Sequence, residues 1–200
     1  MKKALLLILG MCSVLPFFGC GGNVKYLSLR DERLPLEARR WLADAEDEVA
    51  IARARVVDAE NQSAKIEDYR QNMVKELKEQ WGGARGGAAG LKAWQMFAAY
   101  TDERVTLAEL TLRAAQVAED LARMRLTQAR AETAMRYDLA VYELPPIAER
   151  VEKLRDEVAA MTKVVEAQRV KVEKSAGEAW KMFYQFARKN GVTNALWYTY

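Results

Sequence analysis

The sequence predicts an all-α protein: an elongated, antiparallel three-helix coiled-coil bundle that follows a signal peptide. Three observations lead to this fold class. Long segments place apolar residues at alternating steps of four and three, which is the heptad spacing of packed helices. Clusters of glycine or proline separate these segments at two places, residues 82–90 and 145–146, and the 200 residues contain only four prolines. Half of the residues are hydrophobic and 30% are charged, which suits long amphipathic helices.

Residues 1–19 read as a signal peptide. Lys2 and Lys3 form a short positive region, and the apolar run Ala4–Leu9 follows them. Gly10 and Pro16 then interrupt the apolar stretch. A run this short indicates a secretory signal rather than a membrane-spanning helix.

The end of this segment carries a possible lipidation site. Residues 17–20, Phe-Phe-Gly-Cys, resemble the lipobox of bacterial lipoproteins. The resemblance implies that Cys20 is lipid-modified and becomes the first residue of the mature chain, and that Gly21 favours the outer membrane, facing the periplasm. Residues 20–34 would then be a lipidated tether and lead-in, because their glycine-rich start is flexible. The alternative is an ordinary cysteine beside an ordinary cleavage site.

The first helix is expected over residues 36–81, at the start of a coiled-coil domain that spans residues 35–191. Pro35 suits the opening turn of a helix. One heptad seam runs through the segment. Its positions are Ala38, Leu42, Ala45, Val49, Ala52, Val56, Ala59, Ser63, Ile66, Arg70, Met73 and Leu77.

The glycine-rich segment Gly82–Gly90 is expected to end the first helix. A glycine-rich loop before a helix can also indicate phosphate binding, but the P-loop pattern needs Gly-Lys-Ser/Thr. Here Leu91 precedes Lys92 and Ala93 follows it. The segment therefore predicts an interhelical loop.

The second helix is expected over residues 91–142, where Pro145 and Pro146 stop it. It carries two apolar stripes and should therefore have two helix partners. The first stripe is Val105, Ala108, Leu112, Ala115, Ala122, Leu126 and Ala129. The second stripe is Leu107, Leu110, Ala114, Val117, Leu121, Met124, Ala131 and Met135.

The third helix is expected over residues 146–190 and carries the clearest seam of the chain. Its positions are Ile147, Val151, Leu154, Val158, Met161, Val165, Gln168, Val172, Ser175, Ala179, Met182 and Phe186. Three helices of similar length favour an up-down-up bundle in which the first and third helices each pack on the second. An extended hairpin that completes its core in a homo-oligomer is the alternative.

This topology brings most of the aromatic residues to one end. The eight candidate partner-binding residues are Trp81, Trp94, Phe97, Tyr100, Trp180, Phe183, Tyr184 and Phe186. Aromatic anchors dominate many protein interfaces, so this end could be a docking tip. The rings could instead plug the wide end of the bundle. The aromatic C-terminal tail, residues 192–200, could fold back onto the same cluster.

The composition argues against catalysis and against several ligands. The chain has no histidine, and its two cysteines, Cys12 and Cys20, both lie near the start. We therefore expect no enzyme, metal site or cofactor, and no small-molecule substrate. Removal of Lys2 and Lys3 would leave 29 basic and 28 acidic residues, so nucleic-acid binding is not expected.

The remaining functions are those of an envelope helical rod. Residues 105–170 are similar to the helical hairpins of outer-membrane efflux channels and their adaptors, which implies a structural or adaptor role. The expected partners are the membrane, through lipid on Cys20, and another envelope protein or a second copy of the chain. The alternative is a periplasmic chaperone whose helical arms bind unfolded clients. No particular partner follows from these patterns.

Overall fold

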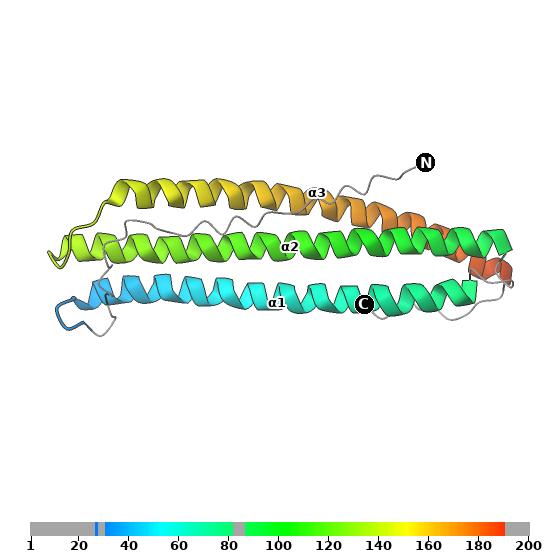
Figure 1. Ribbon diagram of the computed structural model, residues 1–200, viewed down its shortest axis with the longest axis horizontal. Helices are drawn as coiled ribbons and strands as arrows, with labels where there is room; N and C mark the ends of the chain where they lie inside the picture. Colours follow the sequence, from blue (N-terminus) through cyan, green and yellow to red (C-terminus); the bar gives the residue numbers. More distant parts are fainter. Residues whose placement is uncertain (1–26, 28–30, 82–86, 191–200) are drawn as a thin grey trace, which may run out of the picture.

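The computed structural model describes residues 27, 31–81 and 87–190, and this part of the chain forms an elongated three-helix bundle without a strand (Figure 1). The helices are α1 (Leu36–Trp81), α2 (Gly87–Arg136) and α3 (Leu144–Asn190). They contain 46, 50 and 47 residues. At a rise of about 1.5 Å per residue, each helix is roughly 70 to 75 Å long. The predicted fold class is confirmed.

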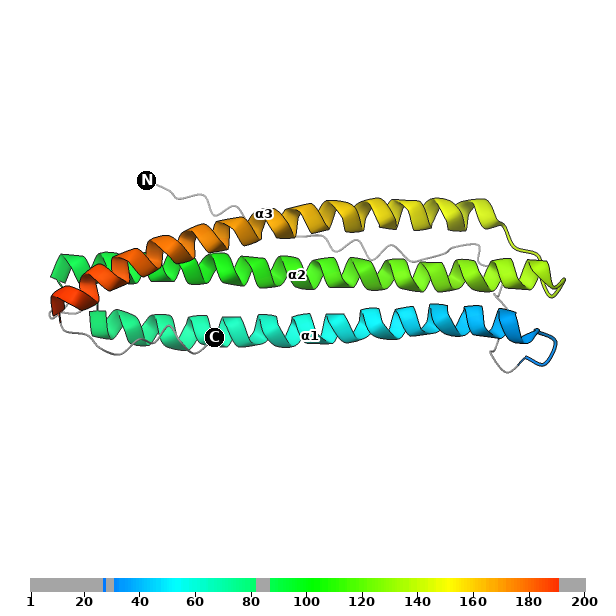
Figure 2. The ribbon, with the colours of Figure 1, turned by 180° about the vertical axis from the view of Figure 1, so that it is seen from behind.

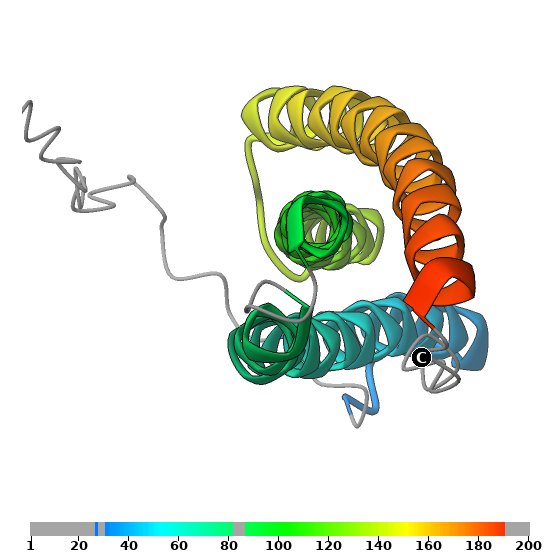
Figure 3. The same ribbon diagram turned by 90° about the vertical axis from the view of Figure 1, so that its right-hand side faces the viewer.

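Helix α2 lies between the other two helices. Both α1 and α3 pack against it, and within the described residues no Cα atom of α1 lies within 8 Å of one in α3. The two outer helices run in the same direction and α2 runs opposite to them (Figures 1 and 2). Figure 3 shows that α3 also curves around α2 along its length. The two predicted stripes of α2 therefore have the two helix partners expected of them.

The heptad seams face the core. Every seam position of α3 from Ile147 to Phe186 is buried or partly buried, and so is every seam position of α1 from Ala38 to Ile66. Arg70 departs from the pattern: it is exposed and its Nε lies 2.7 Å from the Asp102 carboxylate on α2. The last two seam positions of α1 are Met73 and Leu77, whose side chains the structure does not describe.

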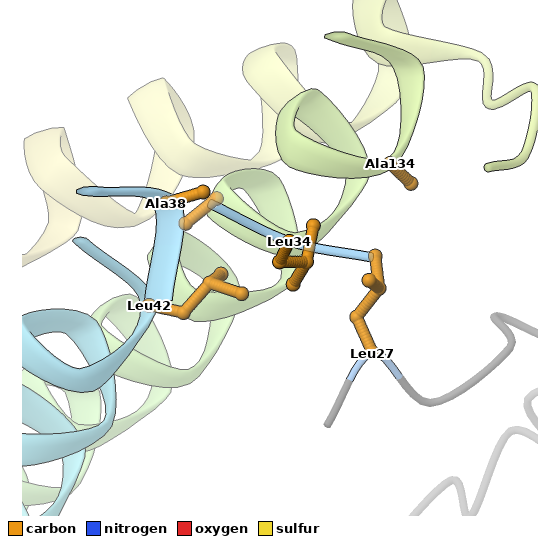
Figure 4. Packing of buried hydrophobic residues seen from close by; sticks show 6 residues of the cluster. Leu27, Leu34, Ala38, Leu42 and Ala134 are labelled. Carbon is orange, nitrogen blue, oxygen red and sulfur yellow. The ribbon is translucent and has the colours of Figure 1, made fainter. Parts of the chain in front are cut away.

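The entry of α1 is held against the end of α2 by a small apolar cluster (Figure 4). Its buried members are Leu27, Leu34, Ala38, Leu42, Ala129 and Ala134. A turn before the helix places Leu34, whose backbone N–H donates to the carbonyl oxygen of Asp31 over 3.1 Å. Burying Leu34 and Leu42 removes both side chains almost completely from water, which fixes where α1 begins.

Helix α2 ends at Arg136 rather than at residue 142, which corrects the predicted boundary. The N–H of Leu139 donates to the carbonyl of Ala134 over 2.8 Å, and the N–H of Asp138 donates to that of Met135 over 3.2 Å. Asp138 has a φ of 53°, so this is a Schellman motif with aspartate at the left-handed position. The helix stops before it reaches the prolines. Met135, expected in the second stripe, is 37% exposed because it lies in this last turn.

Two helix starts also differ from the prediction. Helix α2 begins at Gly87 instead of residue 91, and Gly90 in its first turn is buried, so part of the glycine-rich segment is helical. Gly87 itself has a φ of 55°, which costs glycine little. Helix α3 begins at Leu144 instead of residue 146, because prolines in a first turn remove N–H groups that have no intrahelical acceptor.

Candidate functional site

One end of the bundle is filled by an aromatic cluster built from all three helices. Its buried members are Ala93, Phe97, Phe183 and Phe186, and Tyr69, Trp94, Tyr100 and Trp180 pack against them. The ring centre of Phe97 lies 6.4 Å from that of Tyr69 and 6.2 Å from that of Tyr100. Trp180 and Phe183 are 5.9 Å apart. All three pairs meet edge to face, the arrangement that ring quadrupoles favour.

The structure brings together six of the eight predicted aromatic residues. Phe97, Phe183 and Phe186 are buried, and Trp94, Tyr100 and Trp180 are partly buried. Tyr184 is 66% exposed and is not among the residues that pack in the cluster. The side chain of Trp81 lies outside the described ones. Most of the described rings therefore belong to the core of this end, and Tyr184 is the most exposed of them.

Tyr69 is the aromatic member that the sequence pattern missed. It stands beside the seam of α1 rather than in it, and only the antiparallel register of α1 and α2 places it against Phe97. The Arg104 guanidinium on α2 lies 5.7 Å from the ring centre of Tyr69. The same guanidinium lies 5.6 Å from the ring centre of Tyr100, which is also on α2. A cation between two rings attracts both, so Arg104 links α1 to α2 at the edge of the aromatic cluster.

A groove runs along one side of α2, between α1 and α3. A hollow of about 310 Å³ near the middle of the rod and one of about 490 Å³ nearer the start of α1 are both lined by all three helices. From α2 the first takes Arg104, Leu107, Ala108 and Thr111, and the second takes Arg125, Gln128, Ala129 and Glu132. Each residue of the second set follows one of the first by three heptads, so both hollows lie on the same side of α2. We call this surface the α1–α3 groove.

The central hollow lies next to the aromatic cluster. Arg104 lines the hollow, and its guanidinium lies within 6 Å of the ring centres of Tyr69 and Tyr100. The rest of the lining of the central hollow is mainly apolar. Ile66 from α1, Leu107 from α2 and Val172 from α3 are its largest apolar residues, and Arg169 from α3 also lines it. The sequence pattern did not reveal this groove, because it forms where two outer helices share a partner and their own backbones stay apart, with no Cα atoms of α1 and α3 within 8 Å in the described residues.

The opposite side of α2 is polar and open to water. Ten exposed residues follow the same alternating spacing along it: Lys92, Gln95, Ala99, Asp102, Thr106, Glu109, Arg113, Gln116, Asp120 and Arg123. Apart from Ala99, each has a polar or charged side chain. This side of α2 is therefore a solvated face, in contrast to the groove.

The shifted pKa values belong to ion pairs on the surface. Hydrogen bonds from the Arg33 side chain and then from its backbone N–H lower the pKa of Asp31 from 3.8 to about 2. The hydrogen bond from Lys153 lowers the pKa of Glu149 in the same way. The hydrogen bond to Asp102 raises the pKa of Arg70. These pairs support helix starts and helix contacts, and none of them lines the groove.

Two further features concern residues 27, 31–81 and 87–190. No group of three or more histidine, cysteine, aspartate or glutamate side chains among them could hold a metal ion. Within the same residues, no helix has a stretch long and apolar enough to cross a membrane.

Comparisons with known proteins add no relative. No protein-family model matches the chain, and neither a search of curated proteins nor one of solved structures finds a match. The class of protein is therefore defined by the fold alone: an elongated, all-α, antiparallel three-helix bundle. Its two candidate surfaces are the exposed rim of the aromatic cluster and the α1–α3 groove.

Proposed function

We propose that this chain is a membrane-anchored periplasmic coiled-coil lipoprotein, which acts as a structural or adaptor element in a cell-envelope assembly. The observation that carries the proposal is that the two ends of the rod differ. One end holds the entry of α1, and the other holds the aromatic cluster, roughly 50 to 60 Å away along the helices. A rod of this kind holds a binding surface at a set distance from its anchor.

The anchor end of the rod is assigned from Cys20. This residue precedes Leu27, a buried member of the small apolar cluster at the entry of α1, by seven residues, so an extended tether would keep its lipid within about 25 Å of that cluster. Several acyl chains on one cysteine would give stable attachment, whereas a single chain binds membranes only marginally. The aromatic cluster then lies far from the membrane.

The proposed partner surface is the exposed rim of the aromatic cluster. Tyr184 is 66% exposed and Leu91 is 42% exposed, and both flank the buried cluster at the ends of α3 and α2. The neighbouring rings of Phe97 and Phe183 are only 2% and 4% exposed, so the two exposed residues stand on a well-packed part of the bundle. A rigid aromatic residue at such a place loses little conformational entropy on binding.

Photocrosslinking in cells tests the adaptor role. A photoreactive residue in place of Tyr184 should capture one or two defined envelope proteins. The matched control is the same residue in place of Arg150, which is exposed near the opposite end of α3 and should capture none of them. A broad range of unfolded clients at position 184 would favour the chaperone alternative. Capture of nothing, or equal capture at both positions, would contradict the adaptor proposal.

Fractionation tests the anchor separately. Cys20→Ala should move the chain from the membrane fraction to the periplasmic fraction, because no lipid could then be attached. Cys12→Ala is the control and should leave the chain in the membrane fraction. Unchanged membrane retention of the Cys20→Ala chain would show that lipid on this residue does not hold it there.

A further inference from the structure

The α1–α3 groove is open to solvent between two helices, and its central hollow lies next to the aromatic cluster, toward the end where α3 finishes. Ten residues, 191–200, continue the chain from that end. We propose that this C-terminal segment docks back into the groove and covers the central hollow. The inference is independent of the proposed lipid anchor, since it concerns contacts within one chain.

The length of the segment fits the position of the hollow. Val172 and Arg169 line the hollow from α3 and precede Asn190 by 18 and 21 residues. At about 1.5 Å per residue these positions lie roughly 27 to 32 Å back along the helix. An extended chain covers about 3.3 to 3.6 Å per residue, so residues 197–200 of a segment that turns back would reach about 23 to 36 Å. Residues 191–200 are therefore long enough to reach the central hollow.

The composition of the segment also fits. Residues 191–200 contain no charged side chain, and Leu196, Trp197, Tyr198 and Tyr200 make their last half strongly apolar. Burial of such rings contributes about 25 cal/mol for each Å² of apolar surface removed from water. Gly191 stands at the point where the chain must reverse, and glycine favours the left-handed conformation that ends many helices.

The lining of the hollow offers matching contacts. Ile66, Leu107 and Val172 provide apolar surface from the three helices, and the hollow of about 310 Å³ is large enough for side chains of the segment. The Arg104 guanidinium already lies within 6 Å of the rings of Tyr69 and Tyr100. A further ring from the segment would add to this cation–π arrangement. The polar face of α2 offers no comparable apolar surface.

A photocrosslink within the full-length chain tests this docking. A benzophenone residue in place of Tyr198 should crosslink within the same chain to the lining of the groove, at or near Ile66, Leu107 or Val172, as located by mass spectrometry. Leaving Trp197 unchanged keeps the largest ring of the segment. A crosslink to a second copy, to another protein or to the polar face of α2 would overturn the proposal, and so would the absence of any crosslink.

A pair of blocking variants provides the second measurement. Thr111→Trp fills the groove, whereas Thr106→Trp places the same ring on the polar face of α2. Both threonines donate to the carbonyl four residues earlier, over 2.7 Å from Thr111 and 3.0 Å from Thr106, so both variants lose the same kind of bond. Thr111→Trp should abolish the crosslink and Thr106→Trp should retain it, with equal helical content by circular dichroism. Equal crosslink yields in the two variants would contradict docking in the groove.

Discussion

Gln168 of α3 donates its side-chain amide to the backbone carbonyl oxygen of Glu103 in α2, over 3.2 Å. The same amide also contacts the Glu103 carboxylate. Gln168 is only 5% exposed and occupies a seam position between Val165 and Val172, which are apolar. A buried polar residue in a heptad seam typically sets the register of two helices at some cost in stability. The contact therefore identifies where α3 must lie along α2.

Gln168→Leu should stabilise the bundle by about 1 kcal/mol, because leucine buries more apolar surface. The backbone carbonyl of Glu103 remains available to its own helix, and its partly exposed carboxylate can be hydrated. Urea denaturation followed by circular dichroism measures the change. A loss of more than about 1 kcal/mol would show that the hydrogen bond contributes more than the leucine does.

Gln168→Glu should destabilise the bundle by about 2 to 3 kcal/mol at pH 7, because two carboxylates would then meet in a partly dry seam. Their repulsion raises the folded-state pKa of the pair above the unfolded value. Protonation therefore favours the folded state, and the lost stability should return as the pH falls through the raised pKa. Denaturation at pH 7 and pH 5 measures this, with Gln168→Leu as the control that lacks the new carboxylate.

Asp138→Gly should raise the free energy of unfolding by about 1 kcal/mol. Asp138 has a φ of 53° at the end of α2, and glycine adopts this conformation without a Cβ penalty. Asp138→Ala provides the contrast, because it keeps the Cβ and loses the local polar contacts that aspartate can make. A lower melting temperature for the glycine variant than for the alanine variant would contradict the assignment of the helix end.

Arg33→Ala should move the pKa of Asp31 from about 2 part of the way back toward 3.8, because the side-chain hydrogen bond from Arg33 is the largest cause of the low value, while the backbone N–H of residue 33 still donates to the carboxylate. The folded-state pKa lies below the unfolded one, so the ionised carboxylate stabilises the turn above pH 3.8 and loses this effect as the pH falls to about 2. NMR titration of the Asp31 carboxyl carbon measures the shift. An unchanged midpoint in the variant would assign the low pKa to another cause.

Phe97→Ala and Tyr184→Ala should separate the core of the aromatic cluster from its rim. Phe97 is 2% exposed, so its truncation should cost about 3 to 5 kcal/mol. Tyr184 is 66% exposed, so its truncation should change stability by no more than about 0.5 kcal/mol. Urea denaturation measures both. Equal losses in the two variants would place Tyr184 in the core.

Much of this architecture could be predicted from the sequence, because helix seams are periodic. The seam from Ile147 to Phe186 and the two stripes of α2 already required one helix with two partners. The left-handed Asp138 could not be anticipated in the same way, since glycine is the usual residue at that position. The sequence pattern therefore extends α2 to residue 142, whereas the helix ends at Arg136.

The candidate sites were predictable only in part. Helix lengths and antiparallel order were enough to bring Phe97 and Phe183 together. The position of Tyr69 depends on side-chain register between α1 and α2, and the groove depends on the curvature of α3 around α2 (Figure 3). Both are properties of packing between helices, which a pattern along one helix does not contain. The exposure of Tyr184 has the same origin.

Energy transfer from labelled membranes tests the central claim, which is an anchored rod with its aromatic end away from the lipid. The lipid-modified chain would carry a dye at position 150 or at position 184, both of which are exposed on α3, and vesicles would carry an acceptor on their head groups. These positions lie about 50 Å apart along the helix. The account predicts strong transfer from position 150 and much weaker transfer from position 184. Equal transfer, as from a rod lying flat, or stronger transfer from position 184 would contradict it.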